Sequence, residues 1–84
     1  MFRVVIPPEV DDYLKNVSPV LKRHLRAALD ELKNPCRGKP LRDELKGLHV
    51  YRVGRHWVIY EIIHDKRVVE IQTVGPRNTI YEDF

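Results

Sequence analysis

The sequence has few of the residues that build disulfide-bonded or metal-centred small domains. Cys36 is the only cysteine, so no disulfide can form within the chain and a zinc cage of several thiolates is excluded. The sequence also lacks an apolar run long enough to span a membrane, and its first residues lack the hydrophobic segment of a signal peptide. We therefore expect a protein of a reducing, cytoplasmic compartment with no membrane partner.

Acidic residues are missing from the stretch between Glu44 and Glu61. Residues 32–60 contain seven basic and two acidic residues, a charge of +5, whereas the rest of the chain carries −2. A charge asymmetry of this kind indicates an anionic partner, either a nucleic acid or an acidic protein. The alternative is a solvated loop whose basic side chains only keep the chain soluble.

The length of 84 residues predicts one domain, residues 1–84, near the lower size limit of chains that fold alone. Such a domain buries only about 60–65% of the surface of its unfolded chain. A hydrophobic content of 43% and a charged content of 32% are typical of a folded globular protein. Stability should be modest, and a partner that covers apolar surface would increase it.

The first half of the chain predicts a strand and two helices. Residues 2–6 form a β-rich run that ends at two prolines. Apolar residues then recur at helical spacing over residues 10–17. Ser18 is a good N-cap and Pro19 a good first helical residue, so a second helix should begin there and end at residues 34–35. The short connection between the helices predicts a helical hairpin.

The second half predicts a loop and then three strands. Residues 36–46 are basic and contain glycine and proline, so we expect mostly loop. Strands follow at about residues 49–53, 56–63 and 68–74, with a tight turn at Gly54. The order β-α-α-β-β-β gives an α+β domain: an N-terminal strand, a helical hairpin and a three-stranded antiparallel meander in one small sheet. The hairpin covers one face of the sheet and leaves the other open.

Alternation along the strands separates the two faces of the sheet. We assign Arg52 and Trp57 to the open face, and Arg77 follows the last strand within reach of it. Two neighbouring guanidinium groups repel each other unless an anion lies between them, and phosphate matches their bidentate geometry. On the last strand, alternation predicts that Val69, Ile71 and Thr73 share one face and that Glu70, Gln72 and Val74 share the other.

The motifs in residues 38–49, 52–54, 58–62 and 75–81 resemble those of the RelE/ParE toxins of bacterial and archaeal toxin–antitoxin modules. The likeness covers nearly the whole chain, including the first strand and the helical hairpin. It implies the same β-α-α-β-β-β fold and a cognate antitoxin that wraps around the toxin and masks its basic surface. It implies cleavage of mRNA in the ribosomal A site for the RelE branch, and inhibition of DNA gyrase for the ParE branch.

The resemblance extends to individual residues. Arg52 matches the basic position before the turn glycine, Arg77 the arginine after the last strand, and Tyr81 the tail tyrosine that acts in RelE-type enzymes. Two positions depart from the pattern. Trp57 stands where these toxins have a strand arginine, and Val50 where they often have a basic residue.

The expected activity is a metal-independent endoribonuclease without a cofactor. A ribose 2′-hydroxyl attacks its own phosphate, cations stabilise the transition state and an acid protonates the leaving oxygen. Arg52 and Arg77 would clamp the phosphate and Tyr81 would transfer a proton. His56 or His49 is the alternative proton carrier because histidine titrates near neutrality.

Further residues are expected to bind nucleic acid. Trp57 would stack on an unpaired base, a contact worth about 1–3 kcal/mol, or would instead pack in the sheet. Arg55 and His56 would supply the charge that Trp57 and Val50 lack. Two other functions stay open: a ParE-like inhibitor of DNA gyrase, and a catalytically degenerate member that only binds its antitoxin. The predicted nucleic-acid contacts are Lys39, Arg42, Lys46, Arg55 and Trp57.

Overall fold

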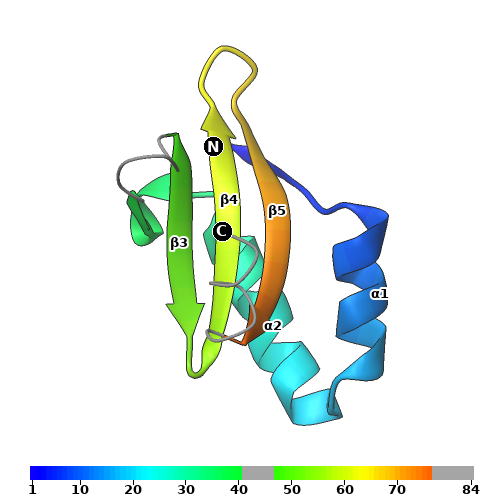
Figure 1. Cartoon of the computed structure of the whole chain (residues 1–84). Helices are drawn as coiled ribbons and strands as arrows, with labels where there is room; N and C mark the ends of the chain where they lie inside the picture. The colour runs from blue at the N-terminus through cyan, green and yellow to red at the C-terminus, as the bar shows by residue number, and fades with distance from the viewer. Residues whose placement is uncertain (41–46, 77–84) are drawn as a thin grey trace.

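The computed structural model describes residues 1–40 and 47–76 (Figure 1). Four predicted site residues, Arg42, Lys46, Arg77 and Tyr81, lie outside this described part. The elements in chain order are β1 (Arg3–Val5), α1 (Pro8–Asn16), α2 (Pro19–Glu31), the 3-10 helix η1 (Pro35–Arg37), β2 (Lys39–Pro40), β3 (Leu48–Val53), β4 (His56–Ile63) and β5 (Val68–Pro76).

The start of α2 follows the signals in the sequence. Ser18 is the N-cap, and its side-chain oxygen accepts the backbone N–H of Leu21 at 3.3 Å. Pro19 occupies the first helical position, where its missing N–H costs nothing. The helix ends at Glu31, a few residues before the predicted end, because the chain has to turn before Pro35 opens η1.

The sheet has five strands in the order β1-β5-β4-β3-β2. Strand β1 runs parallel to β5, and all other pairs are antiparallel. The predicted strand, helical hairpin and antiparallel meander are therefore confirmed. The expected loop at residues 36–46 is wrong at one point, since Lys39 and Pro40 pair with Val50 and His49 as a short edge strand.

An irregularity in β5 changes which residues face the helices. Ile59 pairs with Thr73 and Tyr60 pairs with Ile71, so Gln72 is an extra residue in the ladder. Such a bulge reverses the alternation beyond it. Val74 therefore joins the helix side, and Thr73 lies on the same face as Ile59. The predicted faces of Val74 and Thr73 are wrong for this reason.

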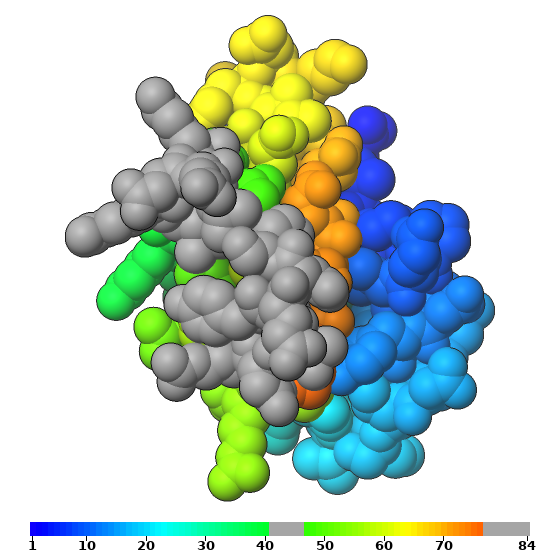
Figure 2. All heavy atoms as spheres, viewed as in Figure 1, coloured from blue at the N-terminus to red at the C-terminus, as the bar shows by residue number. Residues whose placement is uncertain are grey.

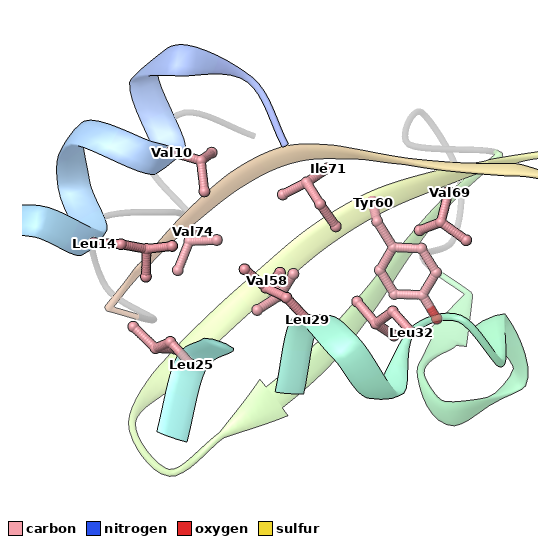
Figure 3. Packing of buried hydrophobic residues seen from close by; sticks show 10 residues of the cluster. All are labelled: Val10, Leu14, Leu25, Leu29, Leu32, Val58, Tyr60, Val69, Ile71 and Val74. Atoms are coloured by element: carbon pink, nitrogen blue, oxygen red, sulfur yellow. The ribbon is translucent and has the colours of Figure 1, made fainter. Parts of the chain in front are cut away.

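The main core lies between the helices and one face of the sheet (Figure 3). Val58 and Tyr60 of β4 lie on this face, opposite to that of Trp57. Fully burying a leucine or valine contributes about 1.5–3 kcal/mol, so this layer fixes the sheet on the hairpin. No helix in the described part of the chain is long and apolar enough to cross a membrane. The cluster consists of Val10, Leu14, Leu25, Leu29, Leu32, Val58, Tyr60, Val69, Ile71 and Val74.

Candidate nucleic-acid interface

The sheet face opposite α2 carries Arg52 and Trp57, as the alternation predicts. The two residues are cross-strand partners on β3 and β4. The guanidinium carbon of Arg52 lies 5.2 Å from the centre of the Trp57 ring, a cation–π contact. Arg52 is exposed, so its side chain is held by the ring while its charge still faces solvent.

Trp57 itself is buried, with 5% of its surface exposed. It packs in a second, smaller cluster with Val50 and Ile59, and Leu48 adds to it. Base stacking requires an exposed ring face, which this side chain does not offer. Trp57 therefore packs in the sheet rather than stacking on a base, and its ring supports the side chain of Arg52.

A hollow lies beside Arg52 at the edge of the sheet. It measures about 310 Å³, the lower end of the range for small-ligand sites. Lys39 reaches it from β2, where it pairs with Val50 and so shares the face of Arg52. Figure 2 views the molecule from this side, with β2 and β3 in green along its left part. The lining residues are Arg37, Gly38, Lys39, Val50, Tyr51 and Arg52.

Arg37 is a residue of this hollow that sequence reasoning counted only as one of many basic residues. It ends η1 and comes two residues before Lys39. The pairing of β2 with β3 is what brings Arg37 to the hollow: Lys39 lies opposite Val50, so Arg37, two residues earlier, lies at the level of Arg52. A two-residue strand containing a proline gives no alternation that would reveal this pairing.

The segment that carries Arg37 and Lys39 is fixed by a buried tyrosine. The hydroxyl of Tyr60, on β4, donates to the carbonyl of Pro35 at 2.7 Å and accepts the N–H of Gly38 at 3.1 Å. Burial raises the pKa of Tyr60, so the hydroxyl keeps its proton for this bond. The two contacts hold η1 and β2 against the sheet.

The structure separates the predicted histidines from Arg52. His56 lies on the helix side of the sheet, where its Nε2 and the hydroxyl of Tyr13 are 2.9 Å apart. His49 also faces that side and stacks on Tyr60, with ring centres 5.4 Å apart. Grouping His56 with Arg52 in one site is therefore not supported. His56 precedes Trp57 on β4, and adjacent residues of a strand point to opposite faces, so it cannot share the face of Trp57 and Arg52.

Burial lowers the pKa of His49, and its Nδ1 is a buried nitrogen without a hydrogen-bond partner in the described part of the chain. The neutral imidazole is thus favoured at this position.

Arg55 lies exposed in the turn after Gly54, which adopts a positive φ of 60°. Among residues 1–40 and 47–76, no three His, Cys, Asp or Glu side chains are grouped so as to hold a metal ion.

The family of the chain follows from its sequence as a whole. A family model described as the ParE toxin of type II toxin–antitoxin systems, parDE, matches residues 9–81. The chain belongs to this family. The resemblance predicted from the motifs is therefore confirmed, and the chain is a toxin of the type II class.

Several similar proteins carry the name RelE. A Mycobacterium tuberculosis protein named Toxin RelE is 45% identical over 51 residues, which cover 60% of this chain and about half, 53%, of that relative. The RelE protein in the M. tuberculosis RelBE2 toxin–antitoxin complex is 26% identical, with a TM-score of 0.78 over 90% of this chain and 91% of the other. An archaeal RelE from Pyrococcus horikoshii, solved with RelB, shares the fold at 24% identity, with a TM-score of 0.74 over 90% and 94%.

Proposed function

We propose that this toxin is an endoribonuclease that cleaves mRNA on the ribosome in the cytoplasm. The observation that carries the proposal is the exposed Arg52 guanidinium, held over the buried Trp57 ring beside a hollow lined by further cations. A fixed cation whose guanidinium is exposed at the surface of the sheet is suited to a phosphodiester. The relatives that carry the name RelE favour the same activity, which the resemblance implies for the RelE branch.

In the proposed reaction the 2′-oxygen of a ribose attacks the adjacent phosphorus. The bond from phosphorus to the 5′-oxygen of the next nucleotide breaks, which leaves a 2′,3′-cyclic phosphate and a 5′-hydroxyl. Arg52 and Arg77 neutralise the charge that develops on the phosphate oxygens, and Tyr81 transfers a proton. Since the 2′-hydroxyl is the nucleophile, RNA is the substrate and DNA is not.

His56 has no part in this proposal, because its ring is engaged with Tyr13 on the other side of the sheet. Arg55, Arg42 and Lys46 are proposed to steer the substrate electrostatically rather than to react. Such steering acts on the rate of association and weakens as salt is added.

The test is to induce the chain in growing cells without an antitoxin and to map transcript ends. Wild type should arrest growth and cut translated mRNA, whereas Arg52→Ala, Arg77→Ala and Tyr81→Phe should each lose most cleavage while remaining folded. Arg23→Ala, on the exposed side of α2, is the matched control and should keep full activity. Full toxicity in all three site variants would show that the site assignment is wrong.

A second candidate function is inhibition of DNA gyrase. The observation in its favour is the family model, which bears the name of the ParE toxins. Supercoiling by purified gyrase in the presence of the chain measures it directly. Arrested growth with intact mRNA and inhibited supercoiling would replace the ribonuclease with this function.

We also propose that a cognate antitoxin binds this chain, with an acidic or amphipathic segment. Several structural neighbours are toxin–antitoxin complexes, and β1 is an edge strand with a groove beside it of about 480 Å³. Arg3→Glu should weaken antitoxin binding more than Arg23→Glu, and the difference should shrink in high salt. The groove is lined in part by Phe2, Arg3, Val4, Ile6, Leu29 and Lys33.

A further inference from the structure

Three cations meet in the hollow beside β2. Arg37, Lys39 and Arg52 all line it, and among the described residues none of the others that line it is acidic. No ion pair joins any of the three to a residue in the described part of the chain. Like charges confined to one hollow repel each other, and an anion placed between them removes that repulsion.

Three basic residues elsewhere in the described chain, Lys15, Arg26 and Lys33, do form ion pairs. Arg26 pairs with Asp11 at 3.3 Å, and Lys33 pairs with Asp30 at 2.7 Å. Glu31 stands at the end of α2, but it accepts a hydrogen bond from the Tyr51 hydroxyl and forms no ion pair with Arg37. The hollow thus keeps its positive charge available for a ligand.

The backbone that carries two of these cations is held in place before any ligand binds. Tyr60 is 0% exposed, and its hydroxyl bonds both Pro35, two residues before Arg37, and Gly38, directly after it. Binding therefore does not have to order this segment, which saves much of the entropy cost of a loop site.

We propose that Arg37 and Lys39 form a second phosphate subsite beside Arg52. It holds the backbone of single-stranded RNA next to the phosphate that is cleaved. The identity of the ligand rests on the proposed function, whereas the presence of an anion subsite rests on the geometry alone. Phosphates recur at every nucleotide, so a strand clamped at Arg52 presents its neighbouring phosphate to the adjoining hollow.

The test measures binding without cleavage. The probe is a fluorescent 2′-O-methyl RNA of about 8 nucleotides, which lacks the attacking hydroxyl, and its anisotropy is followed from low to moderate salt. Arg37→Gln and Lys39→Gln should each weaken binding roughly 5-fold and reduce the slope of log affinity against log salt by about 0.7, the value for one phosphate contact on a single strand. Arg37→Lys should keep the wild-type slope.

Matched controls remove the same charge elsewhere. Arg23→Gln on α2 and Lys66→Gln in the turn before β5 are exposed and should leave the slope unchanged. If Arg37→Gln and Lys39→Gln behave like these controls, or if wild type does not bind the probe in low salt, the subsite is refuted. An intact mRNA in the transcript assay, together with a reduced slope here, would instead refute only the ribonuclease.

Discussion

Removing the hydroxyl of Tyr60 should destabilise the domain strongly, although the change deletes a single oxygen. In Tyr60→Phe the ring keeps its buried place and its stack on His49. The carbonyl of Pro35 loses a buried partner at 2.7 Å, and the N–H of Gly38 loses a partly buried one at 3.1 Å. An unsatisfied buried group costs about 1–3 kcal/mol and an ordinary hydrogen bond contributes about 1 kcal/mol.

The expected loss in the free energy of unfolding is therefore about 2–3 kcal/mol. A domain of this size has roughly 4–12 kcal/mol in total, and its melting temperature should fall by about 10–20 °C. Urea unfolding followed by circular dichroism measures the change, with the slope against denaturant unaltered if only the native state is affected.

Tyr51→Phe is the matched control, because the hydroxyl of Tyr51 bonds Glu31 at the surface. It should cost less than about 1 kcal/mol. If Tyr60→Phe costs no more than Tyr51→Phe, the reasoning about the anchored segment is refuted. A large loss should also speed amide exchange at Gly38 before the rest of the sheet opens.

Three further predictions concern single positions. Gly38→Ala should lower the free energy of unfolding by about 3 kcal/mol in thermal melting, since its Cβ would lie 2.6 Å from the backbone oxygen of Val50. Gly54 has a φ of 60° but no atom within 4 Å of the added Cβ, so Gly54→Ala should cost only about 1 kcal/mol. Equal losses in the two variants would contradict the steric argument. Burial lowers the pKa of His49, so its contribution to the stability of the fold is intact above its unfolded pKa of about 6.5 and is lost as the pH falls. The free energy of unfolding should therefore differ less between pH 7.5 and pH 5.5 in His49→Phe than in wild type. An unchanged difference would count against this role of His49. Trp57→Phe should cost roughly 1–2 kcal/mol and should reduce transcript cleavage while leaving antitoxin binding intact; a loss of both would indicate general unfolding.

The start of α2 and the pairing of β3 with β4 could be predicted from the sequence because the signals for both lie in neighbouring residues. A capping serine before a proline starts α2, and a glycine with positive φ turns the chain between β3 and β4. Strands joined by such a tight turn have a fixed register. Alternation of residues along β3 and β4 was therefore enough to identify Arg52 and Trp57 as neighbours on one face.

The remaining features depend on contacts between distant segments. The extra residue Gln72 reverses the faces of β5 beyond it, and no residue pattern announces it. Strand β2 exists because Tyr60, more than twenty residues later, holds Gly38 and Pro35 on the sheet. Its pairing brings Arg37 and Lys39 to the hollow beside Arg52.

The presence of Trp57 in place of a strand arginine shows how the sequence and the structure have to be combined. Sequence comparison alone treats it as the loss of a cation from the site. In the structure the ring is buried in its own cluster and holds the guanidinium of Arg52 at its surface. If Arg37 and Lys39 restore the missing charge from the edge of the sheet, Trp57→Arg should not improve RNA binding, because it would place a charge among Val50 and Ile59 and cost more in desolvation than it gains.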